Sequence, residues 1–288
     1  MREIKSILVT GASGTFGRAF FRFILKNNMA DRICAFSRNE HAQAEMRAEL
    51  NDDPRARWLI GDVRDEDRLA WAMQGIDLVV HAAALKRIEV NRYNPEEAIR
   101  TNVLGALNVV SAARRAAVSK VVGLSSDKAF LPISCYGQSK ALMESVMLAS
   151  NDTGGATGPR FSCVRYGNIW ASAGSIVPKW LALLRSGATT VPVTSMEATR
   201  YFMLIEEAVE LVIATAFHME GGEVAVPDLP AYRVGDLVEA FGVKPKIIGL
   251  PRFEKLNESM DENRSSDKAP RLSVEFLRGA LELAKGRA

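Results

Sequence analysis

The sequence has few of the residues on which disulfide-bonded and metal-binding proteins depend. Its 288 residues include three cysteines and three histidines. The cysteines show no metal-like spacing, and three of them cannot all pair in disulfides. Cys34 and Cys163 fall in strand-like runs and are predicted to be buried thiols. The composition therefore predicts no metal site and indicates a reducing compartment.

Features of membrane proteins and of nucleic-acid-binding proteins are also missing. No apolar run is long enough to span a bilayer, and residues 1–4 pass straight into a strand-like segment without a leader pattern. The net charge is +3, with basic and acidic residues interspersed. We therefore expect a cytoplasmic protein whose partner is neither a nucleic acid nor a membrane. Residues 265–269 duplicate residues 125–129, but no strand precedes the copy, which we interpret as coincidence.

What the sequence does have is the composition of a globular enzyme. Hydrophobic residues make up 48% and charged residues 25%, which is ordinary for one large domain or two closely joined ones. Strand-like and helix-like segments alternate, and this pattern predicts a parallel sheet with helices on both faces. The predicted fold is α/β: a Rossmann-type doubly wound sheet with a smaller, mostly C-terminal lobe. We assign residues 1–167 and about 200–227 to the cofactor domain, and 168–199 and 228–288 to the substrate lobe.

The first turn of the chain predicts a dinucleotide site. An apolar strand at residues 4–10 leads into a glycine-rich turn with the spacing G-x-x-G-x-x-G, and a helix follows. Such a turn lets the backbone approach a pyrophosphate, whose charge is met by amide groups at the helix start. The alternative is a packing turn without a ligand. The residues predicted to contact the cofactor here are Gly11, Ser13, Gly14, Thr15, Phe16 and Gly17.

The end of the second strand, residues 32–36, favours NADP over NAD. Enzymes that prefer NAD usually place a carboxylate here for the ribose 2′-hydroxyl, but this chain has Ser37 and Arg38. A hydroxyl and a guanidinium suit a 2′-phosphate, although Arg38 alternatively only covers the surface. After the third strand, Asp62 is predicted to accept a hydrogen bond from the adenine amino group, and Val63 to cover the ring. After the fourth strand, three small residues are predicted to let the cofactor lie close: Ala82, Ala83 and Ala84.

Two further segments bear on this edge of the sheet. His81 ends the fourth strand and is predicted to be a packed imidazole rather than a catalytic one. A long helix is predicted over residues 95–117, and its Asn102 is expected to reach back toward the cofactor. The buried stripe of the long helix is predicted to be Ile99, Val103, Leu107 and Val110.

Residues 171–199, rich in Gly, Ser, Thr and Pro, break the alternation of strands and helices.

A cluster of reactive side chains follows the fifth strand, residues 120–124. The chain places a hydroxyl, a carboxylate and an ammonium there, and then a helix-like segment whose Tyr136 and Lys140 share one face. Ligands bind at this edge of open α/β sheets. An ammonium near a phenol favours the phenolate, which can take a proton from a sugar hydroxyl. The alternative is a solvated turn with a half-buried aromatic. The predicted catalytic residues are Ser126, Asp127, Lys128, Tyr136 and Lys140, the last two also touching the cofactor.

Motifs along nearly the whole chain carry a family likeness. They lie at residues 10–17, 37–40, 81–87, 93–95, 101–103, 125–129, 136–140, 165–168, 174–178 and 252–258. On these residues the chain resembles the extended short-chain dehydrogenase/reductases and, within them, soluble inverting UDP-N-acetylglucosamine 4,6-dehydratases. The specific feature is Asp127-Lys128 ahead of Tyr-x-x-x-Lys, because many sugar epimerases lack that pair. Phe253 departs from the family, which has glycine in its Arg-Pro-Gly-Glu run.

The resemblance implies a catalytic cycle. Tyr136, helped by Lys140, removes the proton of the sugar 4-hydroxyl while hydride leaves carbon 4 for NADP⁺, and Ser126 hydrogen-bonds the oxygen. Lys128, with a pKa lowered by burial or by Lys140, then removes the proton at carbon 5. Asp127, held protonated by burial, protonates the departing 6-hydroxyl. Hydride returns to carbon 6, and reprotonation from the opposite face inverts carbon 5.

The resemblance also implies a nucleotide-sugar substrate and a homo-oligomer, either a dimer or a hexamer, in which the helices over residues 95–117 and 137–148 are candidates to pair between subunits. Arg200 is expected to bind the diphosphate and Glu258 a ribose hydroxyl. The alternative for each is a surface ion pair. The full set of substrate-side candidates is Lys86, Asn168, Val177, Arg200, Arg252 and Glu258.

Two other functions stay open. One is a nucleotide-sugar epimerase or reductase that oxidises carbon 4 without eliminating water. The pair Asp127-Lys128 argues against it, because simple epimerisation needs no acid and base at carbons 5 and 6. The other is a non-catalytic NADP-binding regulatory protein on the same fold. The intact Tyr136 and Lys140 argue against that function.

Overall fold

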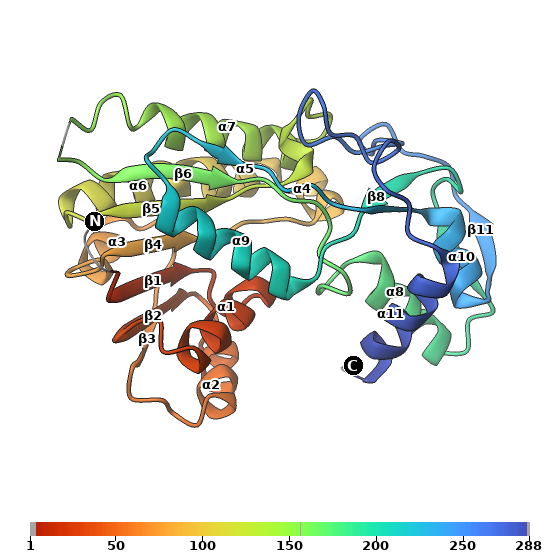
Figure 1. Ribbon diagram of the computed structural model, residues 1–288, viewed down its shortest axis with the longest axis horizontal. Coiled ribbons are helices and arrows are strands. Elements are labelled where there is room, and N and C mark those ends of the chain that lie inside the picture. The colour runs from red at the N-terminus through yellow and green to blue at the C-terminus, as the bar shows by residue number, and fades with distance from the viewer. Residues whose placement is uncertain (1–3, 156, 287–288) are drawn as a thin grey trace.

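The computed structural model describes residues 4–155 and 157–286. A seven-stranded sheet dominates its larger part, in the order β3-β2-β1-β4-β5-β6-β9 (Figure 1). All neighbouring strands in it are parallel. This is the predicted doubly wound arrangement, and the strand order reverses between β1 and β4. The strands are β1 (Ser6–Thr10), β2 (Arg32–Ser37), β3 (Ala56–Ile60), β4 (Leu78–His81), β5 (Lys120–Leu124), β6 (Arg160–Val164) and β9 (Val224–Ala225).

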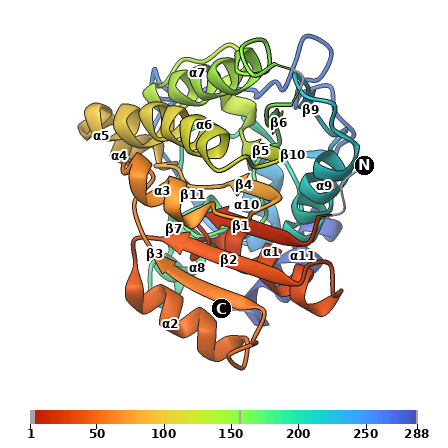
Figure 2. The ribbon, with the colours of Figure 1, turned by 90° about the vertical axis from the view of Figure 1, so that its left-hand side faces the viewer.

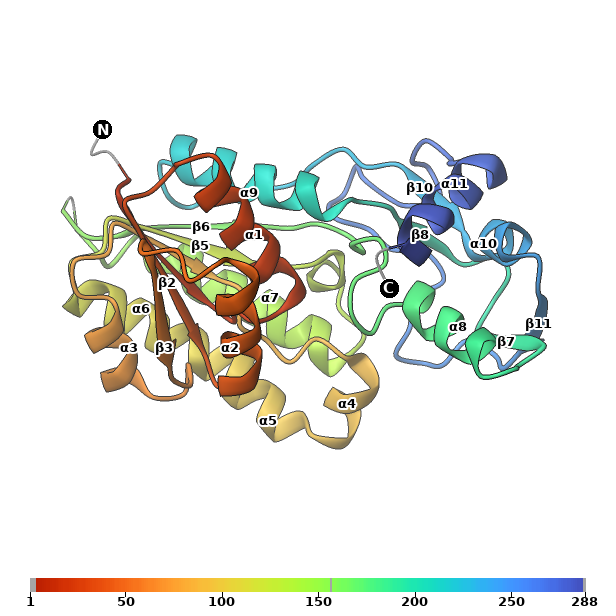
Figure 3. The same ribbon diagram turned by 90° about the horizontal axis from the view of Figure 1, so that it is seen from below.

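Helices cover both faces of the sheet because the strands are apolar on both sides. One face packs against α1 (Thr15–Lys26), α2 (Glu40–Glu49) and α9 (Ile205–His218). The other packs against α3 (Glu66–Ala72), α6 (Gly105–Arg115) and α7 (Cys135–Ala149). Figures 2 and 3 show α1 and α9 on one side of the sheet and α3 and α6 on the other. Cys34 and Cys163 are buried free thiols, as predicted.

The long helix predicted over residues 95–117 forms three joined pieces. They are α5 (Pro95–Ile99), a π-helical turn η1 (Arg100–Leu104) and α6. The predicted stripe is half wrong: Val103 and Val110 are buried, but Ile99 and Leu107 are 48% and 45% exposed. The π-turn shifts the helical phase, and small residues such as Ala106 occupy the packed face instead.

A smaller lobe lies at one end of the sheet (Figure 1). It has its own apolar core, separate from the two cores of the sheet. Residues 171–199, predicted to break the pattern, contribute a helix and a strand to the lobe. The helix tolerates Pro178 because this residue lies in its first turn, where no backbone donor is lost. The lobe elements are α8 (Ile176–Arg185), β7 (Thr190–Val193), β8 (Thr199–Tyr201), β10 (Ala231–Arg233), α10 (Val234–Phe241), β11 (Lys244–Ile247) and α11 (Val274–Gly286).

Two small sheets order the lobe. Strand β8 pairs antiparallel with β10, and β7 pairs parallel with β11. Two short elements at the sheet edge pair with the lobe: α4 (Ile88–Tyr93), after β4, through Glu89 and Lys179, and a 3₁₀ turn η2 (Asp127–Ala129), after β5, through Lys128 and Glu258. Over residues 4–155 and 157–286, no helix is both long and apolar enough to cross a membrane.

Candidate active site

A cavity of about 540 Å³ runs along the carboxyl ends of the strands and under the lobe. It is lined by the loops after β1 to β5, by the start of α7 and by residues 166–169 and 172–176, which follow β6. The following predicted cofactor residues line it: Gly11, Ser13, Gly14, Thr15, Phe16, Gly17, Ser37, Arg38, Asp62, Val63, Ala82, Ala83, Ala84, Tyr136 and Lys140.

The glycine-rich turn fits a pyrophosphate. Gly11 has φ of +68°, and a Cβ there would lie 2.8 Å from the backbone of Ala83. A Cβ at Gly17 would lie 2.3 Å from the carbonyl oxygen of Ala12. These contacts bring the start of α1 against the turn, and its first turn, Thr-Phe-Gly-Arg, has no acidic side chain. Free amide groups at a helix start favour an anion, so this end of the cavity suits a dinucleotide.

Where β2 and β3 end, the cavity is lined by one exposed guanidinium. Arg38 is 54% exposed, and its nitrogen lies 3.6 Å from the carboxylate of Asp62. Asp62 is already held by Arg64, whose guanidinium lies 2.7 Å away. The hydroxyl of Ser37 accepts a hydrogen bond of 2.9 Å from Gln43 and keeps its own proton to donate. The exposed charge of Arg38 at this end suits a phosphate.

Asn102 does not line the cavity, contrary to the prediction. It is fully buried, and its side chain binds the loop after β4 and helix α7. Its amide oxygen accepts from the Leu85 backbone at 2.8 Å, and its amide nitrogen donates to the Ser139 hydroxyl at 2.9 Å. Asn102 therefore ties together two walls of the site rather than touching a cofactor.

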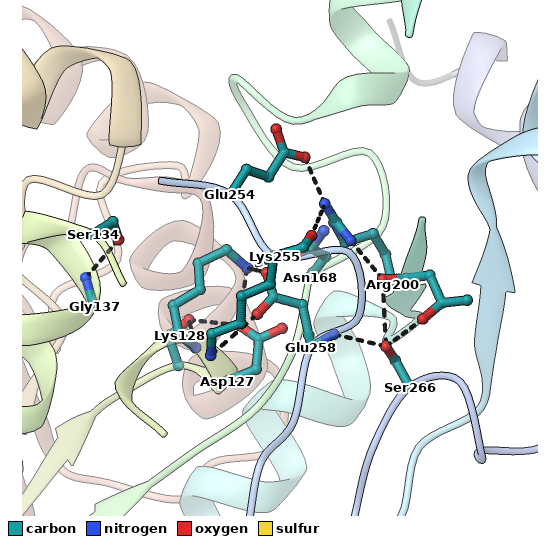
Figure 4. Close-up of polar contacts among 12 residues, drawn as sticks. Asp127, Lys128, Ser134, Gly137, Asn168, Arg200, Glu254, Lys255, Glu258 and Ser266 are labelled. Carbon is teal, nitrogen blue, oxygen red and sulfur yellow. Dashed lines mark hydrogen bonds and ion pairs between the residues drawn. The ribbon is translucent and has the colours of Figure 1, made fainter. Parts of the chain in front are cut away.

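The reactive side chains meet where β5 ends (Figure 4). Asp127 is fully buried, and its carboxylate accepts from the Ser126 hydroxyl at 2.8 Å and from the Lys128 ammonium at 3.0 Å. The same ammonium donates to the amide oxygen of Asn168 at 3.2 Å. The backbone amide of Asp127 donates to the carbonyl of Tyr166, which fixes the turn against β6. A carboxyl, an ammonium and a hydroxyl are thus held within one hydrogen-bonded group.

Gly137, which the sequence-based prediction missed, places Tyr136 beside this group. A Cβ at Gly137 would lie 2.3 Å from the carbonyl oxygen of Lys128, so any larger residue would push α7 off the η2 turn. The helix starts here because the Ser134 hydroxyl accepts from the Gly137 amide at 3.1 Å (Figure 4). The signal was present, since Gly137 belongs to the motif at residues 136–140.

Burial and neighbouring charges set the protonation of Asp127 and Lys128. Burial raises the pKa of the Asp127 carboxyl, and the Lys128 ammonium opposes that effect. Burial disfavours the Lys128 ammonium, but Asp127 and Glu258 outweigh it and raise the pKa of Lys128. The prediction that the pKa of Lys128 is lowered is therefore wrong, because carboxylates face this side chain rather than the ammonium of Lys140.

The pKa of the Tyr136 phenol is shifted by other groups than predicted. Burial raises its pKa, while the Lys128 ammonium and the Ser126 hydroxyl lower it. Lys140 is buried, and its ammonium lies 3.0 Å from the sulfur of Met143. Burial lowers the pKa of Lys140 to about 8. The cation that favours the phenolate in this structure is thus Lys128, not Lys140.

His81 is packed, as predicted. It is fully buried, and its Nδ1 lies 2.8 Å from the Thr10 hydroxyl. Burial, with a smaller effect from Lys140, lowers the pKa of the imidazole to about 3. The ring is therefore neutral and joins β4 to β1.

The predicted substrate-side residues divide into two groups. Lys86 and Asn168 line the cavity. Val177 does not: it is 1% exposed and packs in the core of the lobe, although its neighbours Ser175 and Ile176 do line the cavity. Arg252 is exposed and does not line the cavity.

Arg200 and Glu258 lie elsewhere than predicted. Arg200 is 7% exposed, and its guanidinium donates to the backbone carbonyls of residues 199, 255 and 256 and pairs with Glu254. It does not line the large cavity. Glu258 is 2% exposed, and its Oε1 lies 3.2 Å from the Lys128 ammonium, so it faces the reactive group rather than a nucleotide ribose.

Ser266 and Lys255 are two further residues of this region that the prediction missed. Ser266, from the supposedly coincidental copy at residues 265–269, is fully buried, and its hydroxyl accepts from the Glu258 amide at 2.9 Å. Lys255 donates to the carbonyl of Phe130 at 2.6 Å. Lys255 belongs to the motif at residues 252–258, but no local sequence signal places Ser266, because its contacts arise from packing between distant segments.

Comparisons with known families and proteins identify the relatives of the chain. The model of a family described as polysaccharide biosynthesis proteins matches residues 7–276. The chain belongs to this family. A relative named UDP-N-acetylglucosamine 4,6-dehydratase (inverting), from Campylobacter jejuni, is 40% identical over 258 residues, covering 89% of this chain and 77% of that one. A UDP-glucose 4-epimerase from Rickettsia akari is 39% identical over 275 residues, covering 92% and 80%.

Solved structures share the fold of this member of the polysaccharide biosynthesis family. Pen from Bacillus thuringiensis has a TM-score of 0.91 and 29% identity, covering 98% of this chain and 99% of that one. DesIV from Streptomyces venezuelae, a dTDP-glucose 4,6-dehydratase solved with NAD and TYD bound, has a TM-score of 0.83 and 21% identity, covering 98% and 97%. The predicted resemblance to inverting UDP-N-acetylglucosamine 4,6-dehydratases is confirmed by the Campylobacter jejuni relative, and the solved structures confirm the predicted fold.

Proposed function

We propose that this protein is a nucleotide-sugar 4,6-dehydratase, a lyase that acts on UDP-N-acetylglucosamine with inversion at carbon 5. The observation that carries the proposal is the buried Asp127-Lys128 pair beside Tyr136 at the cavity. Relatives named as dehydratases and as epimerases are almost equally similar, so identity alone does not choose between them. The pair favours dehydration, because an epimerase has no use for an acid and a base at carbons 5 and 6.

The first step belongs to Tyr136. Its phenolate takes the proton of the sugar 4-hydroxyl, and the Ser126 hydroxyl, which donates to Asp127 in this structure, would turn its proton to the sugar oxygen. A nicotinamide cofactor in the cavity would supply the acceptor of the carbon 4 hydride and would return that hydride to carbon 6. The charge of Lys128 favours the phenolate against the effect of burial. This electrostatic link couples the oxidation site to the elimination site.

The second step belongs to Asp127 and Lys128. Burial favours a protonated Asp127, which suits an acid that passes its proton to the departing 6-hydroxyl. Lys128 can remove the carbon 5 proton only after it has released a proton of its own. The carboxylate oxygens within hydrogen-bond reach are those of Asp127 at 3.0 Å and Glu258 at 3.2 Å. The elimination therefore depends on how Asp127, Lys128 and Glu258 share their protons.

NADP is the cofactor that the residues favour. Arg38 presents an exposed guanidinium at the adenosine end, and the end of β2 has no acidic residue to accept the ribose 2′-hydroxyl. The NAD in DesIV argues the other way, but at 21% identity that protein shares the fold alone. The choice rests on Arg38 and is testable by its removal.

A homo-oligomer also belongs to the proposal. Leu104, Leu107 and Leu142, on η1, α6 and α7, are 45%, 45% and 51% exposed. These leucines, on the helices that the sequence predicts to pair between subunits, are the candidate contact with another subunit. A dimer or hexamer and a cytoplasmic location stay predictions.

Proton NMR tests the reaction directly. The protein is incubated with UDP-N-acetylglucosamine and catalytic NADP⁺ in heavy water. We expect a new 6-methyl signal, deuterium at carbon 5, and ring couplings that report the inverted configuration. A 4-epimer without a methyl signal would identify an epimerase instead. An unchanged substrate, with cofactor binding demonstrated, would reject UDP-N-acetylglucosamine, and other sugar nucleotides would then be tested in the same way.

A further inference from the structure

The segment carrying Glu258 is held in place from two sides. Strand β8 binds it through the Thr199 amide, which donates to the Leu256 carbonyl at 3.0 Å, and through Arg200, which donates to the carbonyls of Lys255 and Leu256. The Ser266 amide donates to the Glu258 carbonyl at 2.8 Å, and its hydroxyl accepts from the Glu258 amide. The backbone at Glu258 is therefore fixed on both sides, and its side chain points toward Lys128 (Figure 4).

Among the described residues, two ammonium groups pair with the carboxylate of Glu258, and that of Lys128 is the nearer. The carboxylate lies 3.2 Å from the Lys128 ammonium and 3.8 Å from that of Lys255. The Lys255 ammonium also donates a hydrogen bond of 2.6 Å to the carbonyl of Phe130. A buried carboxylate needs a paired charge to remain ionised, and Lys128 is the nearest. Lys128 thus lies between two carboxylates, Asp127 from the η2 turn and Glu258 from the lobe.

We propose that Glu258 is a positioning residue for the elimination step, which holds the Lys128 ammonium beside Asp127 and sets the pH range over which that pair carries its protons. The inference rests on the proposed function for its kinetic test, but not for its spectroscopic test. It assigns to Glu258 a contact with the reactive pair instead of the predicted contact with a ribose.

The sign of the effect follows from charge. A negative Glu258 disfavours loss of the proton from Asp127 and loss of the proton from Lys128, so both pKa values are higher with Glu258 than without it. Arg200 acts in the opposite direction on Lys128. The titratable and charged groups around this ammonium are Asp127, Tyr136, Arg200, Tyr232, Lys255 and Glu258.

The kinetic test uses Glu258→Gln, which keeps an oxygen for the Lys128 hydrogen bond and removes the charge. We expect both limbs of the pH profile of dehydration to move to lower pH by about one to three units, the usual effect of one close charge. Glu258→Asp keeps the charge and should keep the profile near that of the wild type, even if its rate falls. A Glu258→Gln profile that is scaled down without moving would overturn the proposal.

Glu254→Gln is the matched control. Glu254 lies on the same segment but pairs with Arg200 rather than with Lys128. We expect this variant to change the rate or the melting temperature without displacing the pH profile. An equal displacement in Glu254→Gln and Glu258→Gln would overturn the proposal, because it would trace the effect to loosening of the segment.

The spectroscopic test needs no substrate. In protein labelled with ¹⁵N-lysine, the Lys128 ammonium is assigned by the signal lost in Lys128→Met. We expect that signal to persist to higher pH in the wild type than in Glu258→Gln, and an unchanged titration would overturn the proposal. If the wild type dehydrates no sugar nucleotide, the proposed function fails, while this titration still decides the role of Glu258.

Discussion

Replacing Lys128 by methionine would leave two buried carboxylates without their shared cation. Asp127 is fully buried and Glu258 is 2% exposed, and their oxygens lie 3.0 Å and 3.2 Å from the Lys128 ammonium. With an effective dielectric constant of about 20, each attraction is worth about 5 kcal/mol before the cost of removing the charges from water. Removing one partner of a buried pair usually costs about 3–5 kcal/mol, and we expect Lys128→Met to lose about that much unfolding free energy near neutral pH.

The loss should depend on pH, because the variant can relieve it by binding a proton. Without Lys128, burial and mutual repulsion raise the pKa of at least one carboxyl above its value in the unfolded chain. Such a group destabilises the fold increasingly as pH rises through the interval between its unfolded and folded pKa values. In the wild type, burial opposes the charged form of Glu258, but Lys128, Arg200 and Lys255 lower the pKa of its carboxyl, and that contribution is lost as pH falls. Both effects make the difference between the two proteins smaller in acid.

Urea denaturation of wild type and variant at about pH 7 and about pH 5 measures this difference. We expect it to shrink by about 1–2 kcal/mol at the lower pH, the value of roughly one proton taken up by the variant. Lys179→Met is the matched control, since Lys179 forms an exposed ion pair with Glu89 and exposed pairs contribute about 0–1 kcal/mol. A pH-independent loss, or none at all, would refute the reasoning and assign neutralisation of the carboxylates to Arg200 and Lys255.

Three further changes test other parts of the site. Tyr136→Phe should lower turnover by about 10²–10⁴-fold without accumulating reduced nicotinamide, measured by its absorbance; accumulation would mean that another group takes the 4-hydroxyl proton. Gly17→Ala should cost about 1–3 kcal/mol of unfolding free energy and weaken cofactor binding, because its Cβ would lie 2.3 Å from a backbone oxygen, whereas Gly279→Ala, with open space around it, should not destabilise the protein. Arg38→Ala should weaken NADP binding in calorimetry by about 10–100-fold and leave NAD binding unchanged; equal losses for both cofactors would reject the NADP assignment.

The fold was predictable because its signals are local. Strands buried on both faces are continuous apolar runs, and the helices between them are amphipathic, so the alternation specifies a parallel sheet. The glycine-rich turn and the alanines after β4 were predictable in the same way, since carboxyl ends of parallel strands share one edge. The prediction of one helix over residues 95–117 was wrong in detail, because a π-turn leaves no periodic pattern in the sequence.

The charge environment of the site was not predictable, because it is built from distant segments. Lys140 follows Tyr136 by four residues, which suggested a direct effect on the phenol, but its ammonium lies against Met143 inside α7. Glu258 is 130 residues from Lys128 in sequence and 3.2 Å from it in space. The register between the lobe and the η2 turn decides which of several acids in the 254–262 stretch meets Lys128, and no periodicity carries that information.

This arrangement limits what the Asp-Lys motif alone can say about activity. Two adjacent residues supply an acid and a base, but burial and neighbouring charges decide which of them holds the proton. Here one neighbouring charge, Glu258, comes from the lobe, and Ser266 and Arg200 fix the backbone around it. A relative with the motif but without an acid at the position of Glu258 should therefore eliminate water in a lower pH range.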